Sequence, residues 1–191
     1  MKKILLFIFG IGLMMQNASA QTKTTYYPGT QQKLSEGVLL GADADVLSNN
    51  FESLPKDVQA QKLSVTAKDG VWTYWYPNGD VQRTEQYTNG MMTGIWTGYF
   101  ENGLVSHVLN FTTGDAVYYF SNGKKQSEGK IANNMVQEGH WIGWYQHGIK
   151  NFEGNYVNGT KDGLWVFYDI KGRKTDEQVF QGGNLVTHNK F

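Results

Sequence analysis

Glycine recurs through this chain at nearly fixed intervals, and this repetition limits the folds that the sequence can adopt. Three glycine columns align independently of one another. Glycines that open a Gly-x-Trp pattern, or its counterpart, stand at Gly70, Gly94, Gly114, Gly139 and Gly163; turn glycines follow nine residues later at Gly79, Gly103, Gly123, Gly148 and Gly172; a later turn position holds Gly90, Gly114, Asn134, Gly159 and Gly183. The spacings in every column are 24, 20, 25 and 24 residues. Such a period indicates a repeat array in which each unit is one supersecondary structure.

Each unit is predicted to be a β-hairpin. Aromatic side chains precede the turn, as in the run from Trp72 to Tyr76, and an Asn-Gly pair such as Asn78-Gly79 follows them. Asn-Gly is a strong hairpin signal, because both residues tolerate positive φ. The second strand of each unit is more polar and ends on a bulky residue. These bulky residues are Tyr87, Phe111, Ile131, Tyr156 and Phe180.

The alternation of side chains along a strand separates the aromatic residues into two columns. One face is expected to carry Trp72, Trp96, Ala116, Trp141 and Trp165. Three positions later, and therefore on the opposite face unless a bulge intervenes, stand Trp75, Tyr99, Tyr119, Trp144 and Tyr168. Aromatic side chains on both faces suit units that stack along an axis. The sequence thus predicts an all-β protein in which about five consecutive hairpins form a narrow sheet, with a short irregular or helical N-terminal cap.

The units resemble the MORN-repeat variant family, which is found in many bacteria. The resemblance covers about residues 69–186, but the third unit departs from the pattern because it has Ala116 in place of Trp and no separate opening glycine. The residues that match the structural positions of the motif are Gly70, Trp72, Gly79, Gly94, Trp96, Gly103, Gly139, Trp141, Gly148, Gly163, Trp165 and Gly172. Choline-binding cell-wall repeats are also similar, but the 24-residue period fits the MORN pattern better.

The resemblance implies an elongated, curved, single-layer antiparallel sheet of consecutive hairpins and says less about function. MORN-type arrays are described as attachment platforms for membrane lipids or proteins. Bacterial members of the YwqK group are often labelled antitoxin-like. The resemblance offers no catalytic residue and no cofactor.

The first twenty residues are expected to be a secretory signal. Lys2 and Lys3 precede an apolar stretch, and the small-residue ending Ala18-Ser19-Ala20 predicts cleavage after Ala20. The apolar stretch is short for a membrane anchor. The chain contains no Cys and hence no lipid-anchor thiol. We therefore expect a periplasmic or secreted protein that is not transmembrane after cleavage.

Charge argues against nucleic acid as a partner. Two of the 17 basic residues lie in the signal and all 17 acidic residues lie beyond it, so the mature chain would carry a net charge of −2. Nucleic-acid binding is associated with a basic patch or stripe.

Residues 21–68 fit the repeat poorly and are predicted to be a cap or adapter. Within them, residues 26–37 resemble a degenerate hairpin, and Pro55 could begin a short helix. Residues 187–191 are predicted to be a C-terminal tail.

Motifs of enzymatic or metal chemistry are missing from the sequence. His140 and His147 lie close along the chain, and Asp43 and Asp45 could hold a cation, but no metal-binding or nucleophile motif is present. A column of glutamates at Glu128, Glu153 and Glu177 is expected to repeat at about 10 Å, two strand spacings, and to form a solvated face with neighbouring lysines. We predict no metal site, no cofactor and no catalytic residue.

The aromatic columns remain as candidates for binding. The predicted binding residues are Trp75, Tyr99, Tyr119, Trp144 and Tyr168, because the Trp72 column is expected to form the core. A continuous apolar stripe would favour a protein partner, whereas separate, spaced rings would favour a sugar. The leading hypothesis is an exported, non-enzymatic scaffold that binds a protein. The alternative is a cell-envelope ligand binder for peptidoglycan, a glycan or a lipid headgroup.

Overall fold

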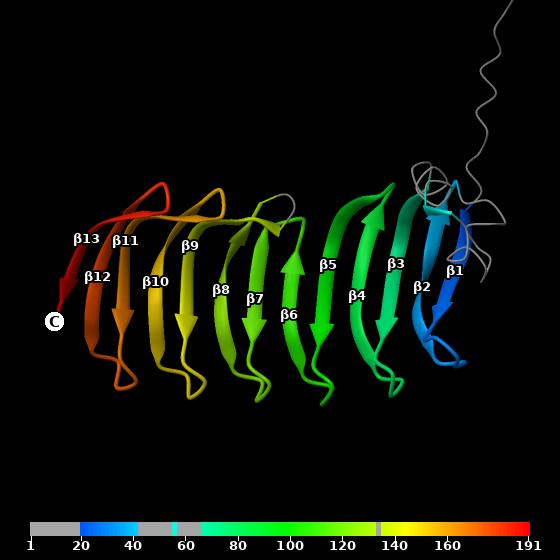
Figure 1. The fold of residues 1–191 in the computed structure, drawn as a ribbon, viewed down its shortest axis with the longest axis horizontal. Coiled ribbons are helices and arrows are strands. Elements are labelled where there is room, and N and C mark those ends of the chain that lie inside the picture. The colour runs from blue at the N-terminus through cyan, green and yellow to red at the C-terminus, as the bar shows by residue number, and fades with distance from the viewer. Residues whose placement is uncertain (1–19, 42–54, 57–65, 133–134) are drawn as a thin grey trace, which may run out of the picture.

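The structure is a computed structural model that describes residues 20–41, 55–56, 66–132 and 135–191. These residues form one sheet of 13 strands, in which the strands follow one another in chain order and each neighbouring pair is antiparallel (Figure 1). The strands are β1 (Ala20–Tyr26), β2 (Lys33–Leu40), β3 (Ala67–Trp75), β4 (Val81–Thr88), β5 (Met91–Tyr99), β6 (Val105–Asn110), β7 (Asp115–Tyr119), β8 (Lys125–Ile131), β9 (Gln137–Trp144), β10 (Lys150–Val157), β11 (Thr160–Tyr168), β12 (Lys174–Gln181) and β13 (Asn184–Lys190). The predicted all-β array of antiparallel hairpins is confirmed.

Two kinds of turn alternate along the array. At the lower edge in Figure 1, a longer turn closes each hairpin, and only its glycine has positive φ, as at Gly79 with +95°. At the upper edge, both turn residues can have positive φ, as in Asn89 with +49° and Gly90 with +80°. The second kind corresponds to the two-residue type I′ turn. The glycine columns therefore mark real turns, although Asn78 itself does not adopt positive φ.

The Gly-x-Trp pattern forms a bulge in the sheet. Between β10 and β11, Glu153 pairs with Val166 and Asn155 pairs with Asp162, so the residue between Glu153 and Asn155 faces the three residues 163–165. Gly163 opens this bulge with a φ of +67°. The same irregularity recurs at Gly70, Gly94 and Gly139, which also have positive φ. Because L side chains adopt this conformation at a cost, the opening column is glycine for a backbone reason.

The bulge places each tryptophan over the preceding strand. The indole Nε1–H donates to a backbone carbonyl there, in the pairs Trp72 with Val38 at 3.0 Å, Trp96 with Gln86 at 2.9 Å, Trp141 with Lys130 at 3.0 Å and Trp165 with Asn155 at 3.0 Å. The four tryptophans are 1–5% exposed. Their rings bury a large apolar area and their N–H groups are satisfied, which is the usual requirement for a buried tryptophan.

A further glycine column lies beneath these rings. A β-carbon at Gly37, Gly129 or Gly154 would overlap ring atoms of Trp72, Trp141 or Trp165, respectively. Glycine thus lets the indole lie flat on the backbone of the neighbouring strand. In the unit of Trp96, the corresponding position on the preceding strand is Glu85, which pairs across the strands with Trp72. It directly precedes Gln86, whose carbonyl accepts the hydrogen bond from Trp96.

The departures of the third unit from the repeat have one structural cause. Strands β6 and β7 pair without a register shift, so this pair lacks the bulge that elsewhere places a tryptophan ring over the preceding strand. Ala116, 1% exposed, pairs with Leu109, 3% exposed, and together they fill the core at this point. Gly114 keeps its positive φ of +74° in the turn between β6 and β7. The shortened spacing and the missing Trp are one structural change.

Both ends of the array continue the sheet. Strands β1 and β2 form a hairpin and β2 pairs with β3, so residues 21–40 of the predicted cap form an additional hairpin of the sheet. Residues 187–190, predicted to belong to a tail, lie in β13, which pairs with β12. Residues 1–19, Asp43, Asp45 and the residues that would continue a short helix beyond Pro55 and Lys56 lie outside the described residues. Within the described part, no helix has the length and apolar character needed to cross a membrane.

A substitution beneath one indole tests this packing. Gly154→Ala should lower the free energy of unfolding by about 1–3 kcal/mol, because the added methyl group forces Trp165 off the strand. Asn155→Ala is the matched control, since its exposed side chain is removed while the carbonyl acceptor stays, and it should change stability by less than about 0.5 kcal/mol. Urea unfolding followed by tryptophan fluorescence measures both. Equal losses in the two variants would contradict the packing.

Candidate binding faces of the sheet

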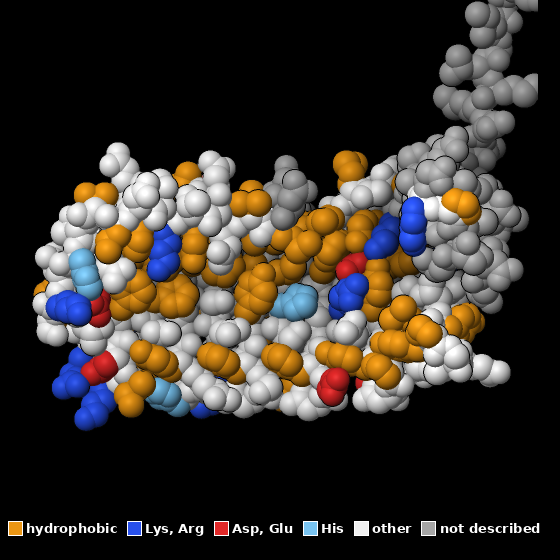
Figure 2. Space-filling view, in the orientation of Figure 1, with side chains coloured by type: hydrophobic (Ala, Val, Ile, Leu, Met, Phe, Trp, Pro, Cys, Tyr) orange, Lys and Arg blue, Asp and Glu red, His pale blue; other side chains and the backbone are white. Residues whose placement is uncertain are grey.

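Strand alternation divides the aromatic side chains between two faces, as predicted. We call the face that carries Trp72, Trp96, Trp141 and Trp165 the Trp face. The opposite face carries the predicted binding column and a series of lysine–glutamate pairs, and we call it the Lys–Glu face. Trp face side chains look toward the viewer in Figure 2, where hydrophobic groups form a band across the strands.

A second row of side chains completes the Trp face. It consists of cross-strand pairs two residues beyond the tryptophan position: Tyr74 with Arg83, Gly98 with His107, Tyr118 with Ser127, Gly143 with Phe152, and Phe167 with Asp176. Where this row has a glycine, the ring from the partner strand lies over it, as His107 does over Gly98 and Phe152 over Gly143. Each hairpin from β3 to β12 therefore contributes one ring to the second row.

The rings of the two rows contact one another along the array. Tyr118 lies 6.1 Å from Trp141 between ring centroids, and Phe152 stacks on Trp165 at 5.6 Å. Farther along, Trp165 also contacts Phe167 at 6.2 Å. The Trp face is thus a nearly continuous apolar surface that no other described layer covers (Figures 1 and 2).

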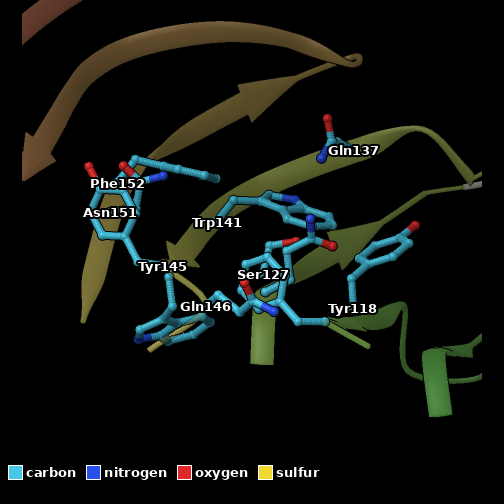
Figure 3. A pocket seen from close by; sticks show the side chains of 11 residues that line it. Tyr118, Ser127, Gln137, Trp141, Tyr145, Gln146, Asn151 and Phe152 are labelled. Atoms are coloured by element: carbon cyan, nitrogen blue, oxygen red, sulfur yellow. The ribbon is translucent and has the colours of Figure 1, made fainter. Parts of the chain in front are cut away.

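A groove interrupts this surface at β8 and β9. Its volume is about 580 Å³, and its walls include the rings of Tyr118, Trp141 and Phe152. Figure 3 shows Trp141 between the other two rings. Ser127 is the second-row residue at this point, so a small side chain stands where neighbouring strands carry or support a ring.

The rim of the groove is polar and uncharged. The amide side chains that line it are Gln126, Gln137, Gln146 and Asn151. None of the lining residues carries a formal charge at neutral pH. Apolar walls with a few amide groups are typical of a ligand site, in which rings supply contact area and amides supply hydrogen bonds.

The predicted binding column has a different environment. Trp75, Tyr99, Tyr119, Trp144 and Tyr168 are all half-buried. Lysine ammonium groups lie over three of the rings, with Nζ-to-centroid distances of 5.7 Å for Lys33 over Trp75, 5.8 Å for Lys125 over Trp144 and 5.2 Å for Lys150 over Tyr168. Trp144, at the end of β9, also lines the groove. The three rings that have a lysine are spaced along the face, on β3, β9 and β11.

The expected glutamate column is present on the Lys–Glu face. Glu128 and Glu153 both pair with Ile142, which places them two strands apart in one row. Each accepts a hydrogen bond from the lysine three residues earlier, at 2.5 Å from Lys125 and 3.1 Å from Lys150. The pairs Lys33–Glu36 and Lys174–Glu177 repeat the arrangement. The carboxylates are thus engaged by lysines of their own strands.

Tyr168 ties the aromatic column to this row. Its hydroxyl donates to Glu153 at 2.5 Å. This hydrogen bond, helped by Lys150, holds the pKa of Glu153 below its ordinary value. The same bond raises the pKa of Tyr168 to about 12, because the phenol proton is held by a carboxylate. The tyrosine is therefore a donor that stays protonated at neutral pH.

A cluster of charged side chains lies on the Trp face near β3 and β4. Glu85 is 7% exposed and accepts hydrogen bonds from Arg83 at 2.8 Å and from Tyr87 at 2.9 Å. Lys68 lies 3.4 Å from the same carboxylate and donates to Tyr74 at 2.5 Å. Burial raises the pKa of Glu85, but the two hydrogen bonds and the nearby cations outweigh it and hold the pKa below 4.5. Every charge in this cluster has a partner.

The other candidates from the sequence form no site in the described residues. His140 lies 4.0 Å from Glu153, and His147 stacks on Tyr145 with its Nε2 3.0 Å from the carbonyl of Ile170. Within the described ranges, no three His, Asp or Glu side chains gather closely enough to hold a metal ion.

Sequence reasoning did not identify the second row. Tyr118 and Phe152 belong to it, and their place on the Trp face depends on a pairing register that only the structure gives. A signal was available in Gly98 and Gly143, which interrupt aromatic strands two residues after a tryptophan. A glycine inside a strand often marks a close approach by another group.

The comparisons with known proteins agree with the repeat. Residues 68–89 match the family model described as MORN repeat variant. This span comprises most of β3 and all of β4, the first Gly-x-Trp hairpin. The match confirms the resemblance predicted from the sequence. No curated protein matches the chain.

The pH dependence of stability tests the charged cluster. The folded-state pKa of Glu85 lies below its ordinary value of 4.5, so its stabilisation is fully present above about pH 4.5 and is lost as the pH falls through the lower folded value. Urea unfolding between pH 7 and pH 3 should therefore show a smaller loss of stability in Glu85→Gln than in the unsubstituted chain. Parallel pH profiles for the two proteins would show that the cluster does not stabilise the carboxylate.

Proposed function

We propose that this chain is an exported, non-enzymatic repeat scaffold that binds a protein partner across the Trp face. A MORN-type repeat suggests a scaffold for binding, and the family is generally non-catalytic. The signal-like sequence before Ala20 supports export to the periplasm or the exterior. A protein is favoured as the partner because the rings of the Trp face form a nearly continuous apolar band.

The observation that carries this proposal is the band of rings from Tyr74 to Phe167. It runs across neighbouring strands of a sheet that has no second layer among the described residues. Contiguous apolar surface rimmed by polar groups is characteristic of protein–protein contacts, and aromatic side chains are enriched at the centre of such contacts. The groove at Ser127 gives the band a pocket in which an anchor side chain could be buried.

The arrangement of charged groups supports a binding role over a catalytic one. Glu85 is held by Arg83, Tyr87 and Lys68, and the glutamates of the Lys–Glu face are held by lysines of their own strands. Such pairs are typical of structural ion networks that fix side chains. The groove itself is lined by rings, hydroxyls and amides.

A second candidate is a cell-envelope ligand, such as a glycan or a lipid headgroup, on the Lys–Glu face. The spaced rings of Trp75, Trp144 and Tyr168 favour it, since each is paired with a lysine ammonium that could also bind an anion or a hydroxyl. This ligand would contact the predicted binding column, whereas a protein partner would contact the band on the Trp face.

Two neighbouring substitutions on β8 separate the candidates. Ser127→Arg places a bulky cation in the groove of the Trp face, and Glu128→Arg places the same side chain on the Lys–Glu face. After affinity capture of a partner from an envelope extract, the Kd of each purified variant for that partner is measured by biolayer interferometry. We expect Ser127→Arg to weaken binding about 30-fold or more, the effect of a hot-spot residue, and Glu128→Arg to bind like the original chain.

Other outcomes of this experiment have definite meanings. Loss of binding in Glu128→Arg alone would favour the second candidate. Equal affinity of all three proteins would contradict both proposed faces. Near-UV circular dichroism shows whether each variant retains the packing of its tryptophans.

A further inference from the structure

Two units of the repeat hold an ammonium group of their own against the Trp face. Lys68 and Lys161 both stand two residues before an opening glycine. The Nζ of Lys68 lies 4.8, 5.2 and 4.8 Å from the ring centroids of Trp72, Tyr74 and Tyr87. The Nζ of Lys161 lies 4.4, 5.1 and 5.1 Å from those of Trp165, Phe167 and Phe180.

Aromatic rings alone can hold the ammonium in the second of these clusters. Lys68 also has Glu85 within reach, but no carboxylate in the described part of the chain forms an ion pair with Lys161. Three rings surround the Lys161 ammonium at distances suited to cation–π attraction. Three rings of one repeat unit can therefore hold an ammonium group without a carboxylate as its ion-pair partner.

The unit that begins with β9 has the rings but not the lysine. Gln137 stands two residues before Gly139, at the position that corresponds to Lys68 and Lys161. Beside it lies the groove, where the rings of Tyr118, Trp141 and Phe152 form the walls (Figure 3). Tyr118 and Phe152 are half-buried, so part of each ring is open to solvent.

The rim of the groove can satisfy the hydrogen bonds of an ammonium. A lysine ammonium has three N–H donors, and the side-chain carbonyls of Gln126, Gln146 and Asn151 are acceptors among the lining residues. None of the lining residues is itself cationic. The groove volume of about 580 Å³ accommodates an extended lysine side chain.

We propose that this groove binds a lysine side chain presented by the protein partner, with its ammonium against the partly exposed rings of Tyr118 and Phe152, beside the buried ring of Trp141. The inference rests on the proposed function and specifies the anchor residue of that partner. Lysine is favoured because two other units hold a lysine ammonium against a tryptophan and a second-row ring, the two kinds of ring that Trp141 and Phe152 supply here. The apolar stem of the lysine would lie along the walls while its charge meets the ring faces.

A short peptide tests the site directly. The probe is the capped peptide acetyl-Gly-Gly-Lys-Gly-Gly-amide, and its control is the same peptide with an Nε-acetylated lysine, which keeps the stem and removes the charge. Titration is followed by NMR of the tryptophan indole N–H signals. We expect saturable shifts centred on Trp141 and binding at least tenfold weaker for the acetylated peptide. Equal binding of both peptides, or no shift at Trp141, would overturn the proposal.

Substitution of Gln137 gives a matched pair of variants. Gln137→Lys should supply the groove with its own ammonium, as in the units of Lys68 and Lys161, and should weaken binding of the lysine peptide at least tenfold. Gln137→Met copies Met92, the residue at this position in the second unit, and should reduce binding by less than threefold. Equal loss of binding in both variants would overturn the idea that the lysine competes for the cage.

Two further comparisons separate this inference from others. Phosphocholine that binds more tightly than the lysine peptide would assign the groove to a headgroup and overturn the lysine assignment. If the captured partner loses affinity for Ser127→Arg but not for Gln137→Lys, the Trp face binds a protein and the lysine anchor is wrong. If neither variant affects the partner while the peptide still binds at Trp141, the proposed function fails and the lysine site stands on its own.

Discussion

The contact between an indole and the backbone of the preceding strand holds this sheet together. The opening glycine allows the bulge, and the bulge places the tryptophan ring over the preceding strand. The indole N–H then donates a hydrogen bond to a backbone carbonyl of that strand. A glycine such as Gly154 makes the close approach possible. Because this contact joins one hairpin to the next, it supplies between units the packing that a second layer supplies in most domains.

The candidate groove arises where the repeat departs from its own pattern. The neighbouring strands fill the second row with a ring or with a glycine covered by a ring, whereas β8 carries Ser127. The position that holds a lysine in the first and last Gly-x-Trp units carries Gln137 beside the same groove. A repeat that is regular for stability thus acquires a distinct site by small changes at two positions.

Much of the fold could be predicted because the repeat states it several times. The glycine columns gave the hairpin turns, and the alternation along strands placed Trp72 and Trp75 on opposite faces. The candidate groove could not be predicted, because Tyr118 and Phe152 meet only through the register of β7 to β10. The role of Gly37 was equally inaccessible, since its ring partner Trp72 lies far along the chain. Turn residues and strand alternation can be identified from the sequence itself. Cross-strand register also depends on the size of each bulge, which the sequence does not give.

The order of the strands has a consequence for how the chain reaches its fold. In the described sheet, every strand pairs only with the strands before and after it in the sequence. Contacts of this kind require only short loops to close, so the entropy lost at each step is small. Folding can then begin at any well-formed hairpin and spread in both directions. By the same logic, an outermost hairpin can open and close again while the centre of the array stays intact.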